Sequence, residues 1–444
     1  MKNIDVNDVI DNATFNPFHW KVLFWCTLVI IFDGYDLVIY GVVLPILMDE
    51  WQLSPYVAGL LGSSALFGMM FGAMGFGMLS DRLGRKKVII GCVVLFSVTT
   101  VINGLATTPW EFGALRFIAG LGIGGVMPNV VSLMSEYSPA RRRSTLVALM
   151  FSGYAVGGMI SAGLGIWIVP NFGWQIMFYL AGVPLLLLPL MLKYLPESVA
   201  FLMAQKREHE ARAVLQQVAP QRKIGEEDVL QVPPTSDSNA PVMELFRSGR
   251  ALSTMMFWVA FFCCLLMVYA LGSWLPKLMS SAGYALSSSL MFLMVLNIGA
   301  IIGAVGGGWL ADRLSLRSVL VAFFIVASAS LALLGYDSPM WFLYTLVGIA
   351  GATTIGSQIL LYAYVAHYYP TSIRSTGLGW ASGIGRNGAI VGPLLGGALL
   401  ATAMPHHMNF LALAVPGIVA MLAIALVDRN GFGFETQPST RPSA

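Results

Sequence analysis

Hydrophobic positions dominate the chain in twelve long runs, separated by shorter stretches that carry most of the charged and turn-forming residues. A helix that crosses the hydrocarbon core of a bilayer needs roughly 20 apolar residues, and each run is close to that length or longer. The pattern therefore predicts an all-α integral membrane protein with twelve transmembrane helices. The runs span residues 22–48, 57–79, 88–106, 110–136, 145–168, 174–195, 252–274, 285–311, 318–336, 340–367, 375–401 and 408–427.

The longest polar stretch, about 193–250, follows the sixth run and contains the sequences QKREHEAR and PPTSDSNAP. It predicts a linker between two six-helix bundles, with one surface helix near 198–218. The expected organisation is an N-terminal tail over 1–21, a first bundle over 22–195, a linker over 196–251, a second bundle over 252–427 and a C-terminal tail over 428–444.

Composition supports the membrane assignment and excludes several functions. Hydrophobic residues make up 57% of the 444 positions and charged residues only 11%, whereas soluble domains carry roughly 25% charge. The net charge of +3 gives no indication of a nucleic-acid partner. The four cysteines sit in apolar runs, and no metal cluster, Ser/His/Asp arrangement or phosphate-binding loop is recognisable. We therefore expect a protein that is not an enzyme and uses no metal or cofactor.

The basic residues indicate the orientation of the helices. Of the 25 Lys and Arg residues, 22 fall in the tails and in the loops on the same side as the N-terminal tail, and Lys277 is the only one in a loop on the other side. Because Lys and Arg are enriched in cytoplasmic loops, both termini are expected to be cytoplasmic.

The two halves repeat each other at a constant shift of 231 residues. FGAMGFGMLSDRLGRKKV at 71–88 aligns with IGAVGGGWLADRLSLRSV at 302–319, and Gly41 and Pro45 align with Gly272 and Pro276. Two related six-helix halves are typical of transporters that bind their substrate at the interface between the halves.

Several motifs give this repeat a family context. GMLSDRLGRK at 77–86, its second copy GWLADR at 308–313, RFIAG at 116–120 and PES at 196–198 resemble signatures of the major facilitator superfamily. The resemblance covers nearly the whole chain. It implies the major facilitator fold, with two pseudo-symmetric six-helix bundles, alternating access to a central site, and no partner beyond substrate, protons and the lipid bilayer. A monomer is expected.

A narrower resemblance lies in the first span. DGYDL at 33–37, followed by Tyr40, Gly41 and Pro45, is similar to the aromatic acid:proton symporters, and GYDLVIYGVVLP is closest to their benzoate-transporting branch. GIGR at 383–386 also fits that family. The resemblance implies proton-coupled uptake of an aromatic carboxylate, benzoate or a hydroxybenzoate, across a bacterial inner membrane.

Ionisable residues that interrupt the repeat are the best candidates for function. A charge at the centre of a span costs at least about 2.5–3.5 kcal/mol, so such residues face the bundle interior and are functional by default. The alternative is a fixed ion pair that only holds helices together. At the 231-residue shift, Asp33 aligns with Cys264, Asp36 with Met267, Arg116 with Val347, Arg386 with Ala155 and Glu136 with His367.

Asp33, Asp36 and Tyr40 share one helical face by their spacing of three and four residues. Two carboxylates so close resist double ionisation, so one of them is expected to carry the coupling proton. The sequence leaves open which one. Arg116 is the expected partner of these carboxylates, and the family resemblance implies that it links protonation to helix packing.

Arg386 is the strongest candidate for binding a substrate carboxylate, because a guanidinium can form two parallel hydrogen bonds to it and stack on aromatic rings. Asp36, Tyr40, Tyr269, Trp274 and Tyr364 complete the predicted substrate site. Aromatic residues in spans are more often packing residues, and this alternative stays open.

The loop motifs supply the predicted gating residues. Their resemblance implies latches that stabilise the outward-facing state through ion pairs between the bundles, whereas the simpler alternative is that their cations only set topology. These residues are Gly77, Asp81, Arg82, Arg85, Glu136, Asp312, Arg313 and His367. Two rival functions remain: the same fold carrying another organic anion, a sugar or an exported drug, and a sensor that binds its ligand without moving it.

Overall fold

The computed structural model describes residues 3–222, 225, 228–231, 242–247, 249–369, 373–402 and 404–428. Within these ranges the side chains of Asn3, Asp81, Ser144, Asp312 and Ser375 lie outside the description. Twelve helical spans are long and apolar enough to cross a membrane, which confirms the predicted number.

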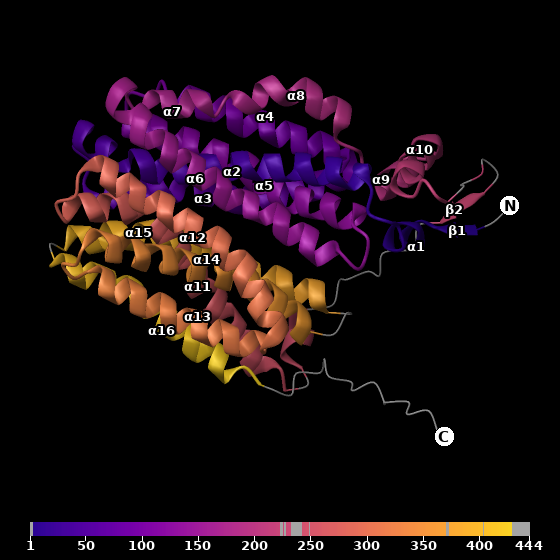
Figure 1. Cartoon of the computed structure of the whole chain (residues 1–444). Coiled ribbons are helices and arrows are strands. Elements are labelled where there is room, and N and C mark those ends of the chain that lie inside the picture. Colours follow the sequence, from indigo (N-terminus) through magenta and orange to yellow (C-terminus); the bar gives the residue numbers. More distant parts are fainter. Residues whose placement is uncertain are drawn as a thin grey trace.

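The spans form two bundles that lie side by side (Figure 1). The first contains α2 (Pro17–Glu50), α3 (Pro55–Leu83), α4 (Arg85–Asn103), α5 (Pro109–Tyr137), α6 (Arg143–Phe172), α7 (Gln175–Leu180) and α8 (Val183–Tyr194). The second contains α11 (Ala251–Ser281), α12 (Leu286–Arg313), α13 (Leu316–Leu334), α14 (Met340–Tyr368), α15 (Arg374–Ala401) and α16 (His406–Leu426). Across the boundary, α2 packs on α11, α3 on α15 and α6 on α12.

The sequence repeat is also a structural repeat. Helix α13 begins and ends 231 residues after α4, so the two helices occupy the same place in their bundles. Gly41 and Gly272, which align at that shift, meet where α2 crosses α11: a Cβ added to Gly41 would lie 2.0 Å from the carbonyl oxygen of Gly272. Equivalent residues touch each other only near a two-fold axis, so the pseudo-two-fold axis passes through this contact.

The sixth span differs from the expected single helix. It is divided into α7 and α8, which are separated by Ala181 and Gly182. Pro184 lies in the first turn of α8; it has no backbone N–H to donate to the preceding turn, and its ring disfavours helical geometry at Val183. Gly182 also disfavours a continuous helix, so the break falls where a glycine and a proline lie close together.

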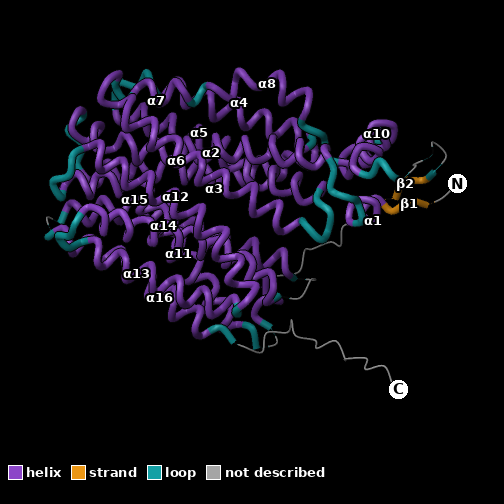
Figure 2. Tube along the Cα trace, viewed as in Figure 1, coloured by secondary structure: helices purple, strands orange, loops and turns teal. Residues whose placement is uncertain are grey.

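The linker also differs from the expected single surface helix. It forms two helices, α9 (Val199–Ala204) and α10 (Glu208–Val218), followed by β2 (Val229–Gln231) and a 3-10 helix, η1 (Val242–Phe246). The N-terminal segment joins it: β1 (Asn3–Asp5) pairs in parallel with β2, and α1 (Val6–Asp11) packs on α10. Figure 2 shows α1, β1, β2 and α10 as a small unit at one end of the bundles, whereas η1 packs on α11 and α15 of the second bundle. We call that end the linker end and the opposite one the far end.

Candidate functional site

A large cavity of about 2680 Å³ lies between the two bundles. It runs from Tyr154, Tyr269 and Arg386, in the middle of their helices, to Arg143 and Arg374 at the linker end. The cavity is therefore open towards the linker end, and residues of both bundles form its wall.

Arg386 supplies the positive charge of the inner part of this cavity. It lies on α15, is partly exposed to the cavity, and makes no ion pair with any carboxylate in the described part of the chain. Tyr362 on α14 also lines the cavity, and the phenol groups of Tyr154 on α6 and Tyr269 on α11 interact across the boundary between the bundles. A cation beside three phenol rings can hold a flat carboxylic acid by its charged end and its ring faces.

The predicted pairing of Asp36 with Arg116 is present inside the first bundle. The guanidinium of Arg116 donates to the backbone carbonyl of Asp36 at 2.9 Å and lies 3.3 Å from its carboxylate. Thr100 on α4 donates its hydroxyl to the other carboxylate oxygen at 2.7 Å. All three side chains are buried. The ion pair is thus isolated from the cavity and from bulk water.

Asp33 lies one helical turn from this pair and has no comparable partner. It is fully buried, and neither carboxylate oxygen has a hydrogen-bond donor among the described residues. The charges of Asp36 and Arg386 both act on it. Asp33 is therefore near enough to both the ion pair of the first bundle and the cavity cation of the second to interact with their charges. The structure brings Asp33, Asp36, Arg116 and Arg386 together around the boundary of the bundles.

The predicted aromatic residues divide into two groups. Tyr269 and Tyr364 line the cavity. Tyr40 and Trp274 are not among the described residues that line it: the Tyr40 hydroxyl donates to the Ala58 carbonyl, and the Trp274 indole donates to the Pro393 carbonyl at 2.8 Å. Both rings are buried in the packing at the far end.

Contacts between the bundles close the far end. Besides the Gly41 contact, the Ser63 hydroxyl on α3 donates to the Ile390 carbonyl on α15 at 2.6 Å. The ammonium of Lys277 on α11 lies 3.5 Å from the carboxylate of Asp49 on α2. The cavity thus opens towards one end of the molecule while hydrogen bonds and helix contacts join the bundles at the other.

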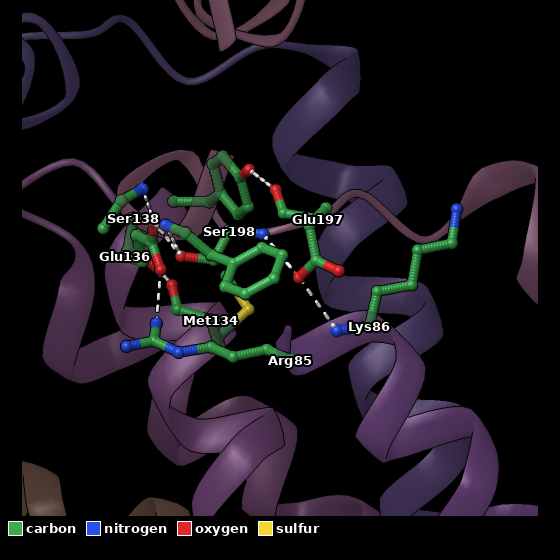
Figure 3. A network of polar contacts seen from close by, with 10 residues as sticks. Arg85, Lys86, Met134, Glu136, Ser138, Glu197 and Ser198 are labelled. Carbon is green, nitrogen blue, oxygen red and sulfur yellow. Dashed lines mark hydrogen bonds and ion pairs between the residues drawn. The ribbon is translucent and has the colours of Figure 1, made fainter. Parts of the chain in front are cut away.

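Two of the predicted gating residues form a polar network at the linker end of the first bundle (Figure 3). Glu136 accepts hydrogen bonds from Arg85, from the Ser198 hydroxyl at 2.8 Å and from the Ala200 backbone at 3.1 Å. Beside it, the Glu197 carboxylate accepts from the backbone N–H groups of Lys86 and Ser198. The network ties α4 and α5 to the start of the linker, within one bundle.

The remaining gating candidates face solvent or the cavity. Arg82 is exposed, His367 lies in the cavity wall, and Arg313 stacks over the ring of Trp309 at 4.0 Å. A Cβ added to Gly77 would meet nothing within 4 Å. Asp81 and Asp312 cannot be placed, because their side chains lie outside the described part. Among the described side chains, no ion pair joins the bundles at this open end.

Sequence reasoning missed Thr100 and Ser63, which contact Asp36 and Ile390. The signal for Thr100 was present: at the 231-residue shift it aligns with Leu331, so it interrupts the repeat just as Asp36 does. Ser63 also interrupts the repeat, because it aligns with Met294. Its partner on the opposite bundle could not be read from the sequence.

Comparison with known proteins gives this arrangement a family. The model of the Major Facilitator Superfamily matches residues 26–362 and 296–441. Over 434 residues the chain is 49% identical to the "Benzoate transport protein" of Acinetobacter baylyi, covering 96% of this chain and 93% of that protein. It is 40% identical to the "Gentisate transporter" of Corynebacterium glutamicum, covering 90% and 85%, and 35% identical to the "4-hydroxybenzoate transporter PcaK" of Pseudomonas putida, covering 95% of each.

Solved structures agree on the fold. The inward-open xylose transporter XylE from E. coli superimposes with a TM-score of 0.72 at 16% identity, covering 92% of this chain and 96% of that one. A bacterial homologue of the lysosomal transporter Spinster gives 0.70 at 19% identity, covering 94% and 98%. The fold and the site define a multi-pass membrane transporter and not an enzyme. The chain belongs to the major facilitator superfamily and, within it, to the aromatic acid transporters.

Proposed function

We propose that the protein carries an aromatic carboxylate, with benzoate as the first candidate, into the cell together with a proton. The observation that carries this proposal is Arg386: a cation without a carboxylate partner in the described part, set among phenol rings in the cavity between the bundles. The 49% identity to a benzoate transport protein supports benzoate ahead of its hydroxylated relatives. Gentisate and 4-hydroxybenzoate follow as candidates.

The substrate carboxylate would bind the guanidinium of Arg386 through paired hydrogen bonds. Tyr154, Tyr269 and Tyr362 would contact the ring of the substrate. An aromatic acid suits this site better than a sugar, because a sugar offers many hydroxyls and no charge to match the arginine. Another organic anion would satisfy the charge but not the ring contacts.

The coupling proton would be carried by the Asp33/Asp36 pair. Asp36 has its charge matched by Arg116 and by the Thr100 hydroxyl, whereas Asp33 has no hydrogen-bond donor among the described residues. An unpaired buried carboxylate gains most from binding a proton. Protonation of Asp33 would also remove the negative charge that competes with the substrate for Arg386. Proton and substrate binding would then favour each other.

Coupling also has an electrical reason. An inside-negative potential opposes the uptake of an anion by about 2.3 kcal/mol per 100 mV. One proton that moves with one monoanion cancels this charge. The pH gradient can then drive accumulation of the substrate.

Transport would proceed by alternating access, and the observed conformation would be the inward-facing state. The 22 Lys and Arg residues in the tails and loops of that side support assigning the linker end to the cytoplasm. The protein would then lie in a bacterial inner membrane with both termini inside. Gly77 and Gly308, equivalent in the repeat, both face open space at this end. Their missing side chains would let the two bundles approach when the linker end closes.

Uptake by purified protein in liposomes tests the proposal. We expect benzoate to accumulate under an inward proton gradient, Arg386→Ala to lose both accumulation and exchange, and Arg386→Lys to recover part of the exchange. Asp36→Asn should still exchange labelled for unlabelled benzoate at equal pH on both sides, without accumulating it.

The same experiment separates the rivals. A panel of labelled gentisate, 4-hydroxybenzoate, xylose and aliphatic acids identifies a different solute if benzoate fails to move. A sensor would bind benzoate but exchange none of it. Accumulation of benzoate that is indifferent to the proton gradient would refute coupling while leaving the aromatic acid assignment intact.

A further inference from the structure

Helix α4 carries a row of buried polar side chains that the substrate site does not use. Ser97, Thr100 and Asn103 are spaced by three residues, so they share one face of the helix, and all three are almost fully buried. Thr100 donates to Asp36. The side chain of Asn103 has no partner for its nitrogen or its oxygen among the described residues, and its fractional exposure is 1%. Buried amides are almost always hydrogen-bonded, so Asn103 calls for an explanation.

The second bundle shows which of these residues belong to the scaffold. Ser97 aligns with Ser328 on α13, and both are buried hydroxyls with no hydrogen-bond partner in the described part. A polar residue that both halves keep at one position is a property of the fold. Asn103 instead aligns with Leu334, which is buried and apolar.

Like Asn103, Thr100 is a polar residue whose counterpart in the second bundle is buried and apolar, because it aligns with Leu331. Asp36, Thr100, Asn103 and Arg116 are therefore four buried polar residues of the first bundle whose counterparts in the second bundle are apolar. Three of them are joined by hydrogen bonds around the Asp36 carboxylate. Asn103 is the fourth and extends the set towards the far end.

The position of Asn103 gives this extension a direction. It is the last residue of α4, about 4.5 Å beyond Thr100 along the helix axis. Leu105, two residues further on, is 67% exposed. The row therefore extends from Asp36 towards the far end, whereas the substrate cavity opens at the linker end.

We propose that Asn103 and Thr100 form a proton path from the far end to Asp36, separate from the substrate cavity. The proposal rests on the proposed function. The amide of Asn103 would hold a water molecule beside the Thr100 hydroxyl. A protonated water would give its proton to Thr100 Oγ while the proton already on that hydroxyl passes to Asp36. One proton enters and one arrives, the water and the threonine are restored, and nothing is oxidised or reduced.

The charged groups around Asp36 are compatible with this transfer. Arg116 on α5 faces it, Asp33 lies one turn away on α2, and the neighbouring phenol of Tyr35 donates to the Met177 carbonyl at 2.8 Å. Asp36 can pass the proton on to Asp33, which lies within reach of the charge of Arg386. The path would therefore end where the substrate binds.

The test compares Asn103→Leu, which copies the second bundle, with wild type in liposomes that contain an entrapped pH-sensitive dye. Benzoate is the probe. We expect benzoate-dependent proton influx and gradient-driven accumulation to fall at least fivefold, while benzoate exchange at equal pH stays within twofold of wild type. Asn103→Ser, which leaves a polar group and room for water, should recover most of the influx. Ser97→Ala, the matched control on the same face, should behave as wild type.

Thr100→Val gives a second variant of nearly unchanged shape, in which influx should fall while exchange persists. Wild-type influx in both Asn103→Leu and Thr100→Val would overturn the path. So would an equal loss of influx and exchange that Asn103→Ser does not reverse, because that is the result of a structural role. Wild-type protein that exchanges benzoate without any proton influx would instead refute the proposed coupling, and the path with it.

Discussion

The two bundles have the same arrangement of helices, but their cores contain different side chains. Where the first bundle has Asp36 and Arg116, the second has Met267 and Val347, and all four side chains are buried. The apolar pair shows that the fold needs no charge at these positions. The ion pair of the first bundle is therefore an addition that the second bundle lacks. The second bundle has its own additional charge, Arg386, on the cavity wall.

The comparison also indicates what the ion pair contributes to stability. Replacing a buried ion pair by well-packed apolar residues is often neutral or stabilising, whereas removing one partner leaves an uncompensated charge. The second bundle is a natural example of the apolar alternative. The fold therefore does not require the charges of the first bundle, and we expect their presence to make its core sensitive to single substitutions.

The largest effect on stability is expected for Arg116→Val. This change leaves the buried Asp36 without its cation and should lower the free energy of unfolding by about 3–5 kcal/mol. Thermal unfolding of the purified protein in detergent measures the loss. If the charge imbalance is its cause, adding Asp36→Met to the same variant should restore most of the stability, because the two positions then copy Met267 and Val347.

The double variant also separates stability from function. It should fold, bind benzoate and accumulate none under a proton gradient. A double variant that remains as unstable as Arg116→Val would show that packing and not charge holds this site. One that still accumulates benzoate would remove Asp36 from the coupling mechanism.

Much of this comparison could be predicted from the sequence. Spans of about 20 apolar residues and a shift constant over 300 residues specify the helices and bundles, and the interruptions of the repeat identified Asp33, Asp36, Arg116 and Arg386. The β1–β2 pair could not be predicted, because each three-residue strand exists only through its distant partner. Nor could the sequence separate Tyr269 from Trp274, because both are aromatic and packing alone decides which one faces the cavity.

An intermediate effect on stability is expected for a substitution at Gly41, where the two bundles meet. Gly41→Ala places a Cβ 2.0 Å from the Gly272 carbonyl oxygen, which is backbone and cannot move aside. We expect a loss of about 1–3 kcal/mol in unfolding free energy and easier opening of the far end. The reaction rate of a cysteine introduced beside Lys277 with a membrane-impermeant thiol reagent reports that opening.

Gly272→Ala is the matched control for this substitution. A Cβ at Gly272 meets nothing within 4 Å, although the two glycines are equivalent in the repeat. It should therefore be neutral, or slightly stabilising because alanine is the better helix former. Equal effects of the two substitutions would show that the contact on the pseudo-two-fold axis does not control closure.

The smallest effect on stability is expected when an exposed ion pair is removed, in contrast to the buried pair of Asp36 and Arg116. Asp8 on α1 lies 2.8 Å from Arg222 of the linker, and both side chains are about half exposed. The hydrogen bond from Arg222 holds the pKa of Asp8 below its ordinary value of 3.8. Because that pKa is lowered in the folded state, the ion pair stabilises the contact between α1 and the linker at neutral pH. This contribution is lost as the pH falls from 3.8 through the lowered pKa.

Asp8→Asn should therefore leave uptake unchanged and raise hydrogen exchange of residues 3–11 at pH 7 by less than twofold, since solvent screens exposed pairs. Wild type and variant should become indistinguishable once the pH is below the lowered pKa of Asp8. A loss of transport in this variant would mean that the contact between α1 and the linker takes part in the transport cycle. The contrast between buried and exposed ion pairs would then no longer account for which charges matter in this protein.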